Sequence, residues 1–286
     1  MSGIISKLKF VPSLLTCSSA FCGVLATILA TDGEKSLIYA SYLVFIACIF
    51  DFSDGFAARL LHAQSELGKQ LDSLADAISF GVAPSAIMYQ LLKQSLRLKG
   101  SLTSFEGWQI AILICAIIIA IFSILRLAKF NIDDEQKHSF KGLATPANAM
   151  LVASIPLINA MTPDDFWIYS IAHALFNADF PFTLMVALIG LQVFVLCEWL
   201  VLLPITLIFS TLMISNLPMF SLKMKTYKYK DNKLVFNFLI FAVIMIICLQ
   251  WIAVPIIISA YVWVSFFKWL GNRRKSEKLA PHQYRF

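Results

Sequence analysis

Long apolar segments alternate with short polar connections along most of the chain. A helix needs about 20 apolar residues to cross the hydrocarbon core of a bilayer. Windows of this kind predict spans near residues 11–30, 37–58, 72–92, 108–128, 146–162, 184–213, 234–250 and 252–270. Only a few residues between Gln250 and Pro255 separate the last two, so these could also form one kinked or re-entrant pair. The pattern therefore predicts an all-α polytopic membrane protein with about eight transmembrane helices.

Two further segments differ from these apolar runs. Residues 161–176 have the pattern of an amphipathic surface helix, with Trp167 and Tyr169 as interfacial anchors. The chain after Leu270 is polar and basic. The six cysteines all lie in apolar segments and lack a paired or metal-binding spacing, which predicts packed, reduced thiols.

The composition excludes a soluble globular protein, because 59% of the 286 residues are hydrophobic and only 14% are charged. The net charge of +6 could suggest nucleic acid as a partner, but its distribution argues against this. With the N-terminus in the cytoplasm, 19 of the 23 Lys and Arg residues fall in cytoplasmic segments. The positive-inside rule thus predicts an even number of spans and two cytoplasmic termini. Basic surfaces on that side would attract anionic headgroups and nucleotides.

Four aspartates stand out in the stretch DFSDGFAARLLHAQSELGKQLDSLAD, residues 51–76. Asp51 and Asp54 are three residues apart. Asp72 and Asp76 are four apart, so on helices each pair projects from one face. Four carboxylates at a membrane boundary repel one another, and a divalent cation is the simplest way to neutralise them. Alternatively, acids can pair with nearby basic side chains only to hold helices together, but this stretch has two basic residues for the four aspartates.

The spacing of this stretch is DxxDGxxAR, then eight residues, then GxxxDxxxD. With every fixed position filled, it resembles the signature of the CDP-alcohol phosphotransferase family. The resemblance implies a six-helix transmembrane core, which we place within residues 1–223. Additional C-terminal transmembrane helices would cover 224–270, and a basic cytoplasmic tail 271–286. The family also implies a homodimer.

The resemblance implies a reaction at the pyrophosphate of a CDP-linked substrate, with two divalent cations that neutralise the attacked phosphoryl group and the leaving CMP. Mg²⁺ and Mn²⁺ suit carboxylate ligands, and Ca²⁺ is also compatible with them. By resemblance, the metal ligands are Asp51, Asp54, Asp72 and Asp76. Asp76 would also be the catalytic residue, as general base on the acceptor hydroxyl. The residues implied to bind CDP and its phosphates are Asp54, Gly55, Ala58, Arg59, Gly68 and Asp72.

Flanking motifs indicate one branch of the family. The segments DSLADAISFGVAPSAI, LRLAKFN, FKGLATPANA and SNLPMFSLK are similar to motifs of the phosphatidylserine synthase branch. This implies transfer of the phosphatidyl group of CDP-diacylglycerol to L-serine, giving phosphatidylserine and CMP, in a bacterial or archaeal inner (cytoplasmic) membrane. The positive-inside rule predicts that the aspartate stretch, and with it the active site, faces the cytoplasm. Arg126, Lys129 and Asn131 end the fourth span and are candidates for binding the acceptor or the lipid phosphate. Arg126 and Lys129 could alternatively be positive-inside anchors.

Two alternatives stay open. The same chemistry could use another alcohol, such as glycerol 3-phosphate or an inositol phosphate, since Lys137 and Lys141 could bind an acceptor phosphate. A cation transporter could also use intramembrane aspartates, although it gives no reason for the glycine spacing.

The chain departs from the family pattern at several positions. Ser13 and Ser19 stand in the first span where Asn is common, and each could still offer a hydroxyl to the nucleotide. Lys129 replaces the usual Arg, and Ala144 the usual Pro. Glu198, an isolated acid in an apolar run, could line a polar cavity, lie in a dimer contact or have no functional role.

Overall fold

The computed structural model describes residues 10–132, 141–161, 198–220, 229 and 232–279. These residues are helical apart from turns and short extended segments, and the β-type contact among them is an isolated antiparallel bridge between Lys141 and Pro218. By length and composition, four helical stretches within the described ranges, two of them containing a short break, can cross a membrane: Val11–Thr31, Lys35–Leu60, Gly107–Ile132 and Lys233–Gly271. The predicted all-α membrane fold is confirmed, and the number of about eight spans stays a prediction.

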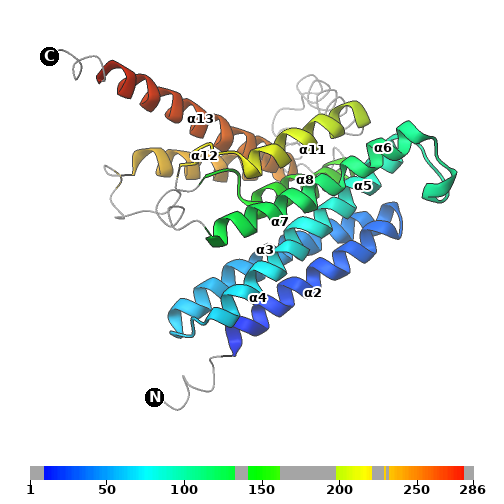
Figure 1. Ribbon diagram of the computed structural model, residues 1–286, viewed down its shortest axis with the longest axis horizontal. Coiled ribbons are helices and arrows are strands. Elements are labelled where there is room, and N and C mark those ends of the chain that lie inside the picture. Colours follow the sequence, from blue (N-terminus) through cyan, green and yellow to red (C-terminus); the bar gives the residue numbers. More distant parts are fainter. Residues whose placement is uncertain (1–9, 133–140, 162–197, 221–228, 230–231, 280–286) are drawn as a thin grey trace, which may run out of the picture.

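The first two spans form a long helical pair, α2 (Val11–Thr31) and α3 (Glu34–Leu60). Figure 1 shows them side by side in blue. Small buried side chains, among them Ala26 and Ala47, allow the two helices to approach closely. Helix α3 extends slightly beyond the predicted limit of 58, and the first aspartate pair lies near its end, where the chain turns into the next helix.

The second aspartate pair lies on α4 (Glu66–Ala77), which continues through a π-helical turn, η1 (Ile78–Val82), into α5 (Ala83–Ser95). Single π-helical turns inside α-helices are rare and occur often at functional sites. The backbone of this turn touches α2 at Gly23, where a Cβ atom would lie 2.7 Å from the Cα of Ser79. The Ser79 hydroxyl donates to the carbonyl of Ser19 at 2.9 Å. Glycine at position 23 thus lets α2 pack directly against η1, just beyond Asp76.

The remaining helices complete the bundle around α8 (Thr145–Asn159), most of whose residues are buried and which contacts α3, α5, α11 and α13. The other elements are η2 (Leu102–Ser104), α6 (Gly107–Cys115), α7 (Ile117–Ile132), α11 (Trp199–Ile214), α12 (Lys233–Leu249), η6 (Gln250–Ile252) and α13 (Ala253–Leu279). One hydrophobic core, centred on side chains such as Phe80, Leu92 and Ile155, joins α2, α3, α5, α7, α8, α11 and α13.

Several predicted boundaries shift. The fourth span is interrupted near Ala116, where α6 ends and α7 begins. A break at Gln250 (φ 50°) separates α12 from α13, and α13 continues past residue 270 to Leu279, so part of the predicted tail is helical. Glu198 immediately precedes α11 instead of lying within a helix. Five cysteines are described and all are free thiols; Cys22 is buried as predicted, whereas Cys17 is exposed and not packed. Most of the predicted surface helix 161–176 and part of the predicted span 184–213 lie outside the described residues.

Candidate active site

A tight turn joins the two aspartate-bearing helices. At the end of α3, His62 adopts φ 47°, and the N–H of Ala63 donates to the carbonyl of Ala58 at 3.0 Å, which is the pattern of a Schellman cap. Ser65 then caps α4, because its hydroxyl accepts a hydrogen bond from the N–H of Gly68 at 3.0 Å. Local sequence therefore determines how α4 leaves α3, and with it the relative position of the two aspartate pairs.

Three of the four aspartates converge. Asp51, Asp72 and Asp76 are half-buried and each offers an oxygen atom within 4.8 Å of the others. All four carboxylates, Asp54 included, lie within electrostatic range of one another. Carboxylates this close repel strongly where burial limits their solvation. The arrangement fits a divalent cation, which prefers oxygen ligands and would offset this repulsion.

Asp54 has a different environment from the other three. It is only 6% exposed, and its Oδ2 accepts a hydrogen bond of 2.5 Å from the hydroxyl of Thr16 on α2. Thr16 is itself buried. The contact fixes the carboxylate of Asp54 from a residue 38 positions earlier in the chain. Thr16 was not predicted as a site residue from the sequence. The signal that could have indicated it is that Thr16 is a polar residue within an apolar span.

A pocket of about 640 Å³ opens between the start of α2, the end of α3 and the start of α4. This volume is within the range of small-molecule sites. All six residues predicted to bind CDP and its phosphates line it: Asp54, Gly55, Ala58, Arg59, Gly68 and Asp72. The other lining residues are Pro12, Ser13, Thr16, Ala63, Gln64, Ser65, Glu66 and Lys69. Of these eight, only Ser13 was expected near the nucleotide from the sequence.

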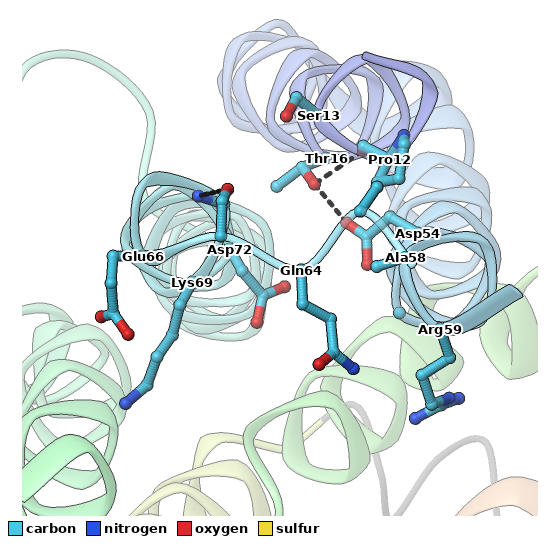
Figure 2. A pocket seen from close by; sticks show the side chains of 14 residues that line it. Pro12, Ser13, Thr16, Asp54, Ala58, Arg59, Gln64, Glu66, Lys69 and Asp72 are labelled. Carbon is cyan, nitrogen blue, oxygen red and sulfur yellow. Dashed lines mark hydrogen bonds between the residues drawn. The ribbon is translucent and has the colours of Figure 1, made fainter. Parts of the chain in front are cut away.

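Charge is distributed unevenly within the pocket. Figure 2 shows the carboxylates of Asp54 and Asp72 directed toward its centre, with Gln64 from the connecting turn between them. Arg59 and Lys69 extend from opposite sides, on α3 and α4. Cations at the rim and acids in the centre suit a ligand that is anionic itself and binds together with metal ions.

The two serines that replace Asn have different roles. Ser13 lines the pocket, where its hydroxyl can reach a ligand. Ser19 is only 1% exposed, donates to the carbonyl of Ala47 at 3.2 Å and is not among the residues that line the pocket. It joins α2 to α3 and η1, so the structure assigns Ser19 to helix packing.

The three candidates for the acceptor site have different partners. Arg126 is buried, has an Nε without a hydrogen-bond partner among the described residues and lies within electrostatic range of Asp76. Lys129 donates to Oδ1 of Asn216 at 3.0 Å, and Asn131 donates to the hydroxyl of Ser73 on α4 at 2.9 Å. Arg126 is thus placed toward the acids, whereas Asn131 connects α7 to α4.

Comparison with known proteins agrees with this geometry. The model of the CDP-alcohol phosphatidyltransferase family matches residues 9–184, which include the pocket, the four aspartates and the end of α7. The chain belongs to this family. The prediction of the family from the aspartate spacing is confirmed. The end of the core at residue 223 stays a prediction, because the match stops earlier.

Similar curated proteins carry more specific names. A CDP-diacylglycerol–serine O-phosphatidyltransferase of Bacillus subtilis is 34% identical over 148 residues, which cover 50% of this chain and 73% of that protein. One of Helicobacter pylori is 35% identical over 157 residues, 54% of this chain and 60% of that protein. An archaetidylserine synthase of Methanothermobacter thermautotrophicus is 34% identical over 151 residues, 51% of this chain and 57% of that protein. The C-terminal third of this chain lies beyond the family match.

Proposed function

We propose that this protein is a CDP-diacylglycerol–serine O-phosphatidyltransferase, which transfers the phosphatidyl group of CDP-diacylglycerol to the hydroxyl of L-serine and releases CMP. One observation carries the proposal. The motif of residues 51–76 folds into an acid cluster beside a nucleotide-sized pocket. Relatives that are similar to this chain are named for the transfer to serine.

The pocket is proposed to hold the CDP part of the lipid substrate. Gly55, Ala58 and Gly68 leave room for the nucleotide against the helices, and Arg59 supplies a guanidinium for a phosphate. Two divalent cations, Mg²⁺ or Mn²⁺, held by Asp51, Asp54, Asp72 and Asp76, would supply charge neutralisation at the pyrophosphate. The hydrogen bond from Thr16 fixes the carboxylate of Asp54 at the edge of the pocket.

Asp76 is proposed as the general base. Its carboxylate takes the proton of the serine hydroxyl, and the hydroxyl oxygen forms a new bond to the β-phosphorus of CDP-diacylglycerol. The bond between that phosphorus and the bridging oxygen breaks, so CMP leaves with the electron pair. Arg126, buried and within electrostatic range of Asp76, is placed to attract the serine carboxylate or the lipid phosphate.

The site lies where a lipid substrate in the membrane and a water-soluble acceptor can meet. The chain is an integral membrane protein, and the basic residues near the pocket support an active site on the cytoplasmic side of the inner membrane. We also propose a homodimer, on the basis of the family resemblance.

A competition assay tests the acceptor. Purified protein in mixed micelles with CDP-diacylglycerol and Mg²⁺ or Mn²⁺ is expected to release CMP when L-serine is added. Unlabelled serine should reduce incorporation of labelled serine into lipid, whereas glycerol 3-phosphate and inositol phosphate should not. CMP release with glycerol 3-phosphate but not with serine would overturn the choice of acceptor. Ion flux in proteoliposomes without any CMP release would overturn the enzymatic function.

A further inference from the structure

An extended segment, Ser215–Phe220, crosses the end of the bundle next to the acceptor candidates. On one side it contacts the residues that precede α8, because the N–H of Gly142 donates to the carbonyl of Leu217 at 2.9 Å. Gly142 has φ 75°, and a side chain there would collide with the carbonyl of Met213, so glycine is required for this close approach. The segment is therefore fixed on its first side by the family core.

Helix α13 fixes the other side of the segment at Phe220. The hydroxyl of Tyr261 donates to the carbonyl of Phe220 at 2.9 Å, and the N–H of Phe220 donates to Oγ of Ser265 at 3.3 Å. Both polar backbone groups of this buried residue are thus satisfied by one helix. The rings of Phe220 and Tyr261 also pack with centroids 4.7 Å apart, and Phe238 of α12 contacts both rings.

The fixed segment is connected to the acceptor candidates on α7. Asn216, four residues before Phe220, accepts the hydrogen bond from Nζ of Lys129 at 3.0 Å. The phenol of Tyr261 also lies within electrostatic range of the Arg126 guanidinium. Both cations at the end of α7 are therefore next to groups whose position depends on α13.

We propose that Tyr261 and Ser265 are positioning residues for the acceptor side of the active site, acting on Lys129 and Arg126 through the segment Ser215–Phe220. This inference rests on the proposed function, because it takes those two cations as the acceptor side. It assigns a role in substrate binding to a helix outside the family match of residues 9–184. The C-terminal helices thus contribute to the active site as well as to the membrane anchor.

Tyr261→Phe is the sharpest test, because it removes one hydroxyl and retains the ring packing. We expect the KM for serine to rise about threefold to tenfold, since a single neutral hydrogen bond is lost. The KM for CDP-diacylglycerol and kcat should stay near the wild-type values, and the protein should still fold, because the ring packing is retained. Ser265→Ala should change the KM for serine in the same direction. Tyr229→Phe is the matched control, because Tyr229 donates one exposed hydrogen bond to Asn237 at 3.0 Å, on α12.

Double-mutant cycles with Lys129→Gln and with Arg126→Gln separate positioning from general stability. If Tyr261 acts through these two cations, Tyr261→Phe should raise the KM for serine less in at least one of the two backgrounds than in the wild type. Additive effects in both cycles, or equal changes in Tyr261→Phe and Tyr229→Phe, would overturn the inference. A wild-type protein that releases no CMP with serine would count against the proposed function alone. The same two cycles would then be measured with the alcohol that supports CMP release, and they would still decide the role of Tyr261.

Discussion

The donor side and the acceptor side of the candidate site are built in different ways. The donor side, around the pocket, comes from the start of α2, the end of α3 and the start of α4, with one short capped turn between the last two. The acceptor side combines the end of α7 with the segment Ser215–Phe220 and α13, through hydrogen bonds between residues 87, 45 and 41 positions apart. The acids and most of the pocket lining on the donor side therefore come from one motif, to which α2 adds Thr16, whereas the acceptor side is assembled from three separate parts of the chain.

This difference agrees with the extent of the family match. The match includes the complete donor side but, on the acceptor side, only the end of α7 and the residues around Gly142. Enzymes could share one reaction but use different alcohols by keeping the contacts of the donor side and changing those of the acceptor side. Variants on the two sides should accordingly affect different kinetic constants.

The largest effect is expected where the two sides meet, at Asp76. Asp76→Asn keeps the shape of the side chain but removes the base, so kcat should fall at least about 100-fold. Nucleotide binding and the thermal unfolding midpoint should be largely preserved. The release of CMP by purified protein measures kcat, and the binding of CDP-diacylglycerol measures the donor affinity. Asp32→Asn is the control, since Asp32 lies between α2 and α3 and accepts a hydrogen bond from Ser36. Near-full activity of Asp76→Asn would exclude Asp76 as the base.

A smaller effect, confined to the donor side, is expected for Thr16→Val. The buried carboxylate of Asp54 loses its hydroxyl partner, and loss of such an orienting contact typically costs about 10-fold to 100-fold in metal affinity or activity. The Mg²⁺ concentration for half-maximal activity and the KM for CDP-diacylglycerol should rise, with the KM for serine unchanged. Thr16→Ser should restore most of the activity. A change only in the KM for serine would contradict the division between the two sides.

The smallest effect of the three is expected on the acceptor side, for Lys129→Gln. We expect the KM for serine to rise about tenfold through loss of one charged hydrogen-bonding group, while the KM for CDP-diacylglycerol stays the same. Lys93→Gln serves as the control, because Lys93 on α5 donates to the carbonyl of Gly100 at 3.1 Å. An unchanged KM for serine in Lys129→Gln would show that Lys129 is only a membrane anchor.

Much of the fold and of the donor side could be predicted from the sequence. Apolar length predicted α2 and α3 to within a few residues, because membrane spans are determined by a local property of the chain. The spacing of the aspartates indicated that Asp51, Asp72 and Asp76 share a site, since two short helical intervals and one turn bring them together.

The contacts between distant residues could not be predicted in the same way. Hydropathy treats Thr16, Ser19 and Tyr261 as polar exceptions in apolar helices, and it does not indicate which helix each one faces. Helix packing pairs Thr16 with Asp54, Ser19 with the α3 backbone and Tyr261 with Phe220. Ser19 was therefore assigned to the nucleotide from the family pattern, although the structure uses it between helices.

The π-helical turn at Ile78–Val82 restricts where the length of this protein can vary. Each residue added to or removed from an α-helix rotates the later part of that helix by about 100° relative to the earlier part. Asp72 and Asp76 precede the turn, and α5 follows it in the core. The turn itself packs closely against Gly23 of α2. A one-residue insertion at 78–82 would therefore turn either the acids away from their cluster or α5 out of the core. The largely exposed connection at residues 96–106, between α5 and α6, has no such helical continuity, so natural and engineered length variation should collect there instead of in η1.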